Sequence, residues 1–220
     1  MAALRGVVIG DSQIKFLERD RLRLVPSVQV CTFSFPGAST RTLPGEVGRL
    51  HLHATDFVAV YVGGNDLYGG DSAEAISSRI EELVTTLKGL TSHVLVFKLV
   101  PRGGPLGHAR ESERLSLNSL LVRKLVVLGV TIVNVDHLFL SRGNVVNLEK
   151  LAVDRYHVCR VRGIQCIAFA LSKALAKLFG RSILGGCRAA FRRFRVHRCG
   201  RCGACGHWSG ACLHFAALQH

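Results

Sequence analysis

Short β-branched runs alternate with longer helical segments five times in the first 180 residues of this 220-residue chain. The runs predict strands over 6–9, 28–33, 57–62, 93–100 and 130–135. The other segments predict helices over 12–20, 41–50, 72–88, 111–128 and 161–179. Strands that alternate with helices pair in parallel, because each helix carries the chain back across the sheet. The pattern therefore predicts an α/β fold of three layers, with a five-stranded parallel sheet covered on both faces.

Charge divides the chain into two unequal parts. Residues 1–154 hold 17 of the 29 basic residues and all 15 acidic ones, a net charge of +2, whereas residues 155–220 hold 12 basic residues and no acid. Such a basic segment favours a polyanion, either a nucleic acid or an anionic membrane surface. We therefore expect a domain over 1–180, a basic linker over 181–198, a small cysteine-rich module over 199–212 and a tail over 213–220.

The expected location follows from what the sequence does not contain. We find no apolar run long enough for a transmembrane helix and no secretory signal at the start, so we expect an intracellular protein of the cytoplasm or nucleus, not a secreted one. Five of the eight cysteines lie within 187–212. Such a cluster in an intracellular chain indicates metal binding more than disulfide bonds.

Residues suited to acyl transfer follow the predicted strands, where ligands of parallel α/β sheets bind. Ser12 follows the first strand, Gly37 the second and Asn65 the third, and Asp154 precedes His157 by three residues at the expected start of the last helix. A carboxylate that holds one nitrogen of a histidine leaves the other free to act as a base for a serine. Each residue also has a simpler interpretation, as a helix cap, a loop glycine, a turn or a surface pair.

These blocks, Gly10-Asp11-Ser12, Gly37, Gly63-Gly64-Asn65-Asp66 and Asp154-x-x-His157, resemble in order and spacing those of the SGNH, or GDSL-type, ester hydrolases. The resemblance covers residues 4–180 and implies a flavodoxin-like fold. It also implies a Ser12–His157–Asp154 triad, and an oxyanion hole formed by the N–H groups of Ser12 and Gly37 with the Asn65 amide. The substrate would be a small ester.

Three residues depart from the pattern of this family. Gln13 stands where the family often has leucine, Arg155 lies inside the last block, and Val158 follows the histidine where leucine or proline is frequent. None of them removes a catalytic atom. An Arg155 side chain paired with Asp154 would weaken the hold of that carboxylate on His157.

The C-terminal segment contains Cys199-x2-Cys202-x4-His207-x4-Cys212. Three thiolates and one imidazole form a closed tetrahedral set for a structural Zn²⁺ ion. The spacing resembles the retroviral-type CCHC zinc knuckle, which implies binding of single-stranded RNA or DNA. The alternative is a cysteine-rich tail that meets the spacing by chance. Other side chains would compete for the metal: Cys187, His197, Cys205 and His214.

Arginines and aromatic residues alternate around this motif, which suits phosphate pairing and base stacking. A solvated linker or a basic amphipathic helix on a membrane surface is the alternative. The candidate nucleic-acid-binding residues are Arg188, Phe191, Arg192, Arg193, Phe194, Arg195, Arg198, Arg201 and Trp208.

The order of these regions resembles the first-open-reading-frame proteins of some LINE-type retrotransposons, which implies a retroelement-derived protein. Three hypotheses remain open. The chain is an active esterase with a nucleic-acid-binding tail, a catalytically silent SGNH scaffold in a nucleic-acid-binding protein, or a plain esterase with a degenerate tail.

Overall fold

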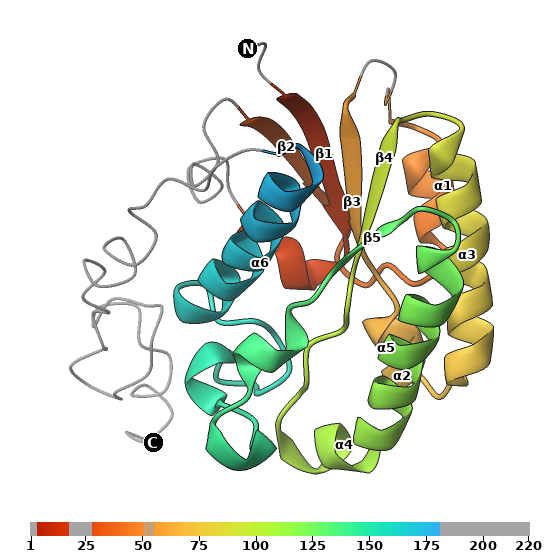
Figure 1. Ribbon diagram of the computed structural model, residues 1–220. Helices are drawn as coiled ribbons and strands as arrows, with labels where there is room; N and C mark the ends of the chain where they lie inside the picture. Colours follow the sequence, from red (N-terminus) through yellow and green to blue (C-terminus); the bar gives the residue numbers. More distant parts are fainter. Residues whose placement is uncertain (1–3, 18–27, 51, 53–54, 181–220) are drawn as a thin grey trace, which may run out of the picture.

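The computed structural model describes residues 4–17, 28–50, 52 and 55–180. They form a five-stranded parallel sheet in the order β2-β1-β3-β4-β5, with helices on both sides (Figure 1). The predicted α/β fold with a five-stranded parallel sheet is confirmed. The strands are β1 (Leu4–Gly10), β2 (Val28–Ser34), β3 (Phe57–Tyr61), β4 (His93–Phe97) and β5 (Thr131–Val133).

Three long helices cover the sheet. Helix α3 (Ala73–Lys88) packs along α5 (Glu111–Val126), and α6 (Arg162–Leu178) lies apart from them across the sheet (Figure 1). The short helices are α1 (Leu43–Val47), α2 (Gly64–Tyr68) and α4 (Gly104–Ala109). Single 3₁₀ turns are η1 (Ser12–Ile14), η3 (Asp136–Phe139), η4 (Arg142–Asn144) and η5 (Leu148–Lys150).

The middle of the sheet is an apolar layer between these helices. Every residue of β3 is buried, as expected for a parallel strand covered on both faces. Gly10 at the end of β1 is in register with Ser34 on β2 and with Tyr61 on β3. The loops that follow these three strands therefore begin at one edge of the sheet, which brings Ser12, Gly37 and Asn65 to the same place.

Two predicted helices were wrong in extent. The helix predicted over 12–20 is, in its described part, the single 3₁₀ turn η1, because the N–H groups of Ile14, Lys15 and Leu17 bond three residues back rather than four. The helix predicted over 41–50 is shortened to α1, with Pro44 in its first turn and Gly48 at its end.

The helix predicted over 161–179 is confirmed as α6, but the placement of Asp154 and His157 at its start was wrong. They do not open the last helix, because α6 begins at Arg162 and both residues lie in the loop before it. The expected linker, basic region, zinc ligands and tail over 181–220 lie outside the described residues. No helix in the described ranges is long and apolar enough to cross a membrane.

Candidate functional site

Ser12 is held at the end of β1 by a turn that needs glycine beside it. A Cβ atom on Gly10 would lie 2.3 Å from the Tyr61 carbonyl oxygen, so no larger residue fits there. Asp11 then donates its N–H to the same Tyr61 carbonyl and accepts the N–H of Gln13 through its carboxylate. This side-chain cap fixes the turn that presents Ser12 above the sheet.

The loop before α6 brings a histidine and a carboxylate to this serine. His157 Nε2 lies 3.0 Å from Ser12 Oγ, and His157 Nδ1 lies 2.7 Å from Asp154 Oδ2. Asp154 Oδ1 accepts the N–H groups of both Tyr156 and His157 at 2.9 Å. The structure thus brings together all three residues of the predicted triad.

The protonation of this pair follows from its contacts. Burial opposes ionisation of Asp154, but the hydrogen bonds from the His157 ring and from the two backbone N–H groups outweigh it and lower the pKa of this carboxyl. An ionised carboxylate only accepts hydrogen bonds, so Nδ1 of His157 carries the proton. Nε2 is then the acceptor for the Ser12 hydroxyl, as a general base requires.

The same loop is closed on itself. Ala152 donates its N–H to the His157 carbonyl at 2.7 Å and accepts the Arg155 N–H at 2.9 Å, while Leu151 and Val158 form an antiparallel bridge. Arg155 occupies the left-handed region, at φ +56°, in this turn. Among the described residues it forms no ion pair with Asp154, so the competition expected from the sequence is not seen.

Gln13 is a positioning residue whose role was not recognised from the sequence. Its buried amide donates to the Tyr156 carbonyl at 3.2 Å and accepts the Val158 N–H at 2.9 Å. It therefore ties the turn that carries Ser12 to both sides of His157. The only signal in the sequence was its polar amide at a position where the SGNH pattern often has leucine.

Gln13→Met keeps the length of the side chain but removes both hydrogen bonds. It is expected to lower roughly tenfold the kcat of a reaction that uses Ser12 and His157, with little change in KM. Because the variant leaves the buried Val158 N–H without an acceptor, the unfolding free energy should also fall by about 1–3 kcal/mol. Initial rates and urea unfolding measure the two effects. Gln165→Met on α6 is the matched control, and a kcat equal to that of the wild type would refute the positioning role.

The predicted oxyanion donors lie on the loops that follow three neighbouring strands, β1, β2 and β3. In the described part of the chain, the N–H groups of Ser12 and Gly37 form no hydrogen bond. Gly37 has a φ of +81°, which glycine adopts without strain. Asn65 Nδ2 donates one hydrogen to the Ala38 carbonyl at 2.8 Å, which leaves its second hydrogen for another acceptor.

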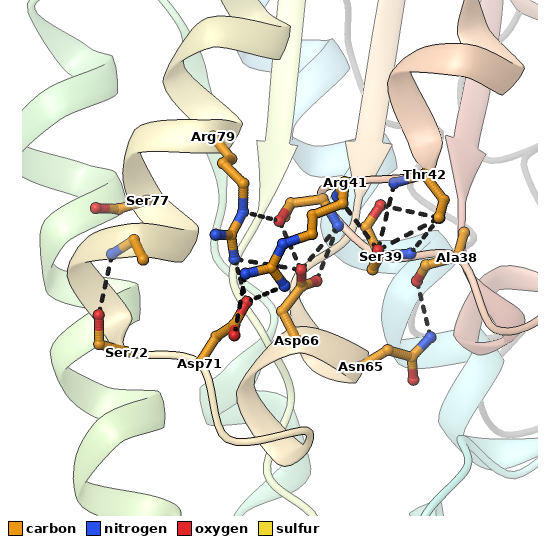
Figure 2. A network of polar contacts seen from close by, with 12 residues as sticks. Ala38, Ser39, Arg41, Thr42, Asn65, Asp66, Asp71, Ser72, Ser77 and Arg79 are labelled. Atoms are coloured by element: carbon orange, nitrogen blue, oxygen red, sulfur yellow. Dashed lines mark hydrogen bonds and ion pairs between the residues drawn. The ribbon is translucent and has the colours of Figure 1, made fainter.

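A buried carboxylate anchors the loop that carries Gly37. Asp66, the residue after Asn65, accepts the Thr40 N–H at 2.9 Å and the Thr40 hydroxyl at 2.6 Å, and Figure 2 shows its carboxylate close to Arg79 and Asp71. The Thr40 hydroxyl in turn accepts a hydrogen bond from Arg79, which also reaches Asp66 and Asp71. The two loops that supply Gly37 and Asn65 are thereby fixed relative to each other.

A buried arginine packs against two tyrosines next to the site. The Arg102 side chain lies between the rings of Tyr68 and Tyr156, with its guanidinium carbon 3.9 Å and 3.3 Å from their centres. The Tyr156 hydroxyl donates to Asn65 Oδ1 at 3.4 Å, and the Tyr156 ring packs edge-on against His157. Tyr156 thus contacts both His157 and Asn65, a predicted oxyanion donor, and its ring packs against Arg102. Neither residue was predicted.

Asp11, next to Ser12 in the chain, is fully buried, and its carboxyl interacts electrostatically with Arg102. Burial raises the pKa of Asp11 to about 6, although the Gln13 N–H and the charge of Arg102 oppose the rise. Its Oδ2 has no hydrogen-bond partner among the described residues. Because the native state binds this proton more tightly than the unfolded chain, the unfolding free energy falls as the pH rises from about 4 to about 6.

Asp11→Asn removes this titration but leaves an oxygen for the Gln13 N–H. When the pH is raised from 4 to 7, the unfolding free energy of the variant should therefore rise by roughly 2–3 kcal/mol relative to that of the wild type. Urea unfolding at the two pH values measures the change, and other groups cancel because both proteins share them. Asp56→Asn, at the opposite end of β3, is the control. If the unfolding free energies of wild type and Asp11→Asn changed equally between the two pH values, Asp11 would not titrate as a buried group.

A pocket of about 540 Å³ opens beside Ser12 and His157, large enough for a small organic molecule. Among the described residues, no group of three or more His, Cys, Asp or Glu side chains has metal-binding geometry. The predicted zinc ligands Cys199, Cys202, His207 and Cys212 and the predicted nucleic-acid-binding residues all lie outside the described ranges.

Comparison with solved structures identifies the fold. The chain is similar to a lipolytic protein of the G-D-S-L family from Veillonella parvula DSM 2008, with 12% identity and a TM-score of 0.65 over 78% of this chain and 97% of that chain. It is also similar to a lipase/acylhydrolase from Enterococcus faecalis, with 15% identity and a TM-score of 0.64 over 82% of this chain and 98% of that chain. A third similar structure is Axe2, an acetylxylan esterase from Geobacillus stearothermophilus, with 15% identity and a TM-score of 0.62 over 81% of this chain and 95% of that chain. No protein-family model and no curated protein matches the sequence. The fold is thus that of the GDSL, or SGNH, lipolytic hydrolases.

Proposed function

We propose that this chain is a carboxylic ester hydrolase of the SGNH type that acts through Ser12, His157 and Asp154. The observation that carries the proposal is the continuous line of contacts from Ser12 Oγ to His157 Nε2 at 3.0 Å and from His157 Nδ1 to Asp154 Oδ2 at 2.7 Å. A serine paired with an oriented base is an activated nucleophile. The acylhydrolase and esterase activities named for similar structures agree with this chemistry.

In the proposed mechanism, His157 takes the Ser12 proton as Oγ attacks the ester carbonyl, and Asp154 stabilises the imidazolium. The N–H groups of Ser12 and Gly37 and the second amide hydrogen of Asn65 donate to the oxyanion. Each such donor contributes roughly 3 kcal/mol to lowering the barrier. His157 then protonates the leaving alcohol and afterwards activates a water molecule, which releases the acyl group and restores Ser12.

The test is hydrolysis of 4-nitrophenyl acetate by the full chain, with zinc present, beside Ser12→Ala. Turnover that depends on Ser12 supports the esterase. Background rates from a folded wild-type protein would instead favour the alternative, in which the SGNH domain is a catalytically silent scaffold in a nucleic-acid-binding protein.

We further propose that the C-terminal segment binds Zn²⁺ through Cys199, Cys202, His207 and Cys212 and binds single-stranded nucleic acid. The support is the CCHC spacing together with 12 basic residues and no acid over 155–220. The combination of an SGNH fold with such a tail is also the basis for proposing a retroelement origin.

Replacing Cys199 and Cys202 together by serine is expected to abolish the binding of one zinc ion per chain and to weaken binding of a 20-mer of polyuridine at least tenfold. If the five arginines over 188–198 contact phosphates, the slope of log K against log salt should be about −3 to −4 for wild type. Metal analysis and fluorescence anisotropy measure these effects. Cys31→Ser, at an exposed free cysteine, is the control. A metal-free wild type would overturn the zinc proposal.

A further inference from the structure

The pocket beside Ser12 carries positive charge that the proposed reaction does not use. Lys15 and Arg160 line it together with Ser12 and His157, and none of its described lining residues is a carboxylate. Apolar side chains, among them Phe16 and Val153, form much of the remaining wall. A polar ester with an uncharged acyl and alcohol part would need neither cation.

The two cations lie on the two segments that carry the proposed nucleophile and base. Lys15 follows Ser12 by three residues, and Arg160 follows His157 by three. Both lie over the same aromatic ring, with Lys15 Nζ 5.6 Å and the Arg160 guanidinium carbon 5.1 Å from the centre of Phe16. Lys15 and Arg160 thus contact the same ring, that of Phe16, at the wall of one pocket.

Neither charge is neutralised within the described part of the chain. Lys15 and Arg160 form no ion pair there, whereas Arg41, Arg79 and Arg114 each pair with a carboxylate. Asp154, the carboxylate of the site, is already engaged by the His157 ring and two backbone N–H groups. Within the described residues, the pocket therefore presents two cations without an acidic partner to a bound molecule.

We propose that the ester substrate bears an anionic group, a carboxylate, phosphate or sulfate, which Lys15 and Arg160 bind. The apolar part of that arm packs against Phe16 and Val153, while the ester carbonyl lies over Ser12. This inference rests on the proposed esterase function and specifies its substrate class. The anion belongs either to a soluble ester or to the headgroup of a lipid ester.

The experiment compares two esters that differ in one charge, 4-nitrophenyl hydrogen adipate and its neutral methyl ester, as substrates of the full chain. Wild type should prefer the anionic ester by roughly tenfold in kcat/KM at low salt, and the preference should shrink as salt screens the cations. Lys15→Gln with Arg160→Gln should remove most of that preference. The control exchanges two exposed cations that do not line the pocket, Lys173→Gln and Arg123→Gln, and should keep it.

A wild-type kcat/KM ratio of anionic to neutral ester near 1 would overturn the anion site, and so would a ratio that is unchanged in Lys15→Gln/Arg160→Gln. In either case, Ser12-dependent hydrolysis of the neutral ester would still support the esterase. Absence of hydrolysis of every ester would overturn both. Dihexanoyl phosphatidylglycerol and dihexanoyl phosphatidylcholine separate the two sources of the anion. A preference for phosphatidylglycerol over phosphatidylcholine in kcat/KM that exceeds the preference for the anionic over the neutral adipate indicates a lipid headgroup, and a smaller one indicates a soluble anionic ester.

Discussion

Ser12→Ala is expected to reduce hydrolysis of 4-nitrophenyl acetate to background, a loss of at least about 10⁴-fold in kcat/KM. The reason is that alanine leaves His157 with no hydroxyl to deprotonate, so no acyl-enzyme forms. The half-buried Ser12 hydroxyl has His157 as its partner, so its loss should leave the fold intact. Initial rates measure the effect, and circular dichroism checks the fold.

Ser119→Ala on the exposed face of α5 is the matched control, because it removes one hydroxyl far from the site. Its rate should equal that of wild type. If Ser12→Ala hydrolysed the ester as fast as wild type, the activity would come from another group, and the proposed nucleophile would be wrong.

Asp154→Asn is expected to lower kcat by about 10³–10⁴-fold without unfolding the protein. Asp154 Oδ1 accepts two backbone N–H groups while Oδ2 faces His157 Nδ1. An asparagine that keeps the backbone bonds must therefore present its NH₂ group to Nδ1. That donor forces the proton onto Nε2, where His157 can no longer accept the Ser12 hydrogen.

The kcat of Asp154→Asn is measured with 4-nitrophenyl acetate, and urea unfolding shows whether the loop is retained. Asp56→Asn is the control, since Asp56 also accepts a backbone N–H, that of Arg5, but at the far end of the sheet. A kcat within tenfold of wild type would mean that the carboxylate does not set the tautomer of His157.

The sheet could be predicted from the sequence because its strands are short, β-branched and buried on both faces. The β3 run Phe57–Tyr61 is an example in which local propensity and burial agree. The region after β1 could not be predicted in the same way. Its apolar residues Ile14 and Leu17 have helical spacing, but their backbone forms successive three-residue turns capped by Asp11.

The residues of the candidate site were predictable in type and order, but not the contacts that hold them. Gln13 and Val158 are 145 residues apart in the chain, and Arg102 meets Tyr68 and Tyr156 from a different loop. Such contacts depend on which loops the topology places together. A sequence pattern read along one strand or helix does not contain that information.

The most direct test of Ser12 as the nucleophile is covalent labelling of the full chain with a fluorophosphonate, followed by peptide mass spectrometry. The phosphorus forms a bond to an activated serine oxygen and releases fluoride, so the reagent reports the nucleophile itself rather than a rate. We predict one adduct per chain, on Ser12; the adduct should be absent in Ser12→Ala and should form much more slowly in Asp154→Asn. An unlabelled wild type, or an adduct on another residue that persists in Ser12→Ala, would contradict this prediction.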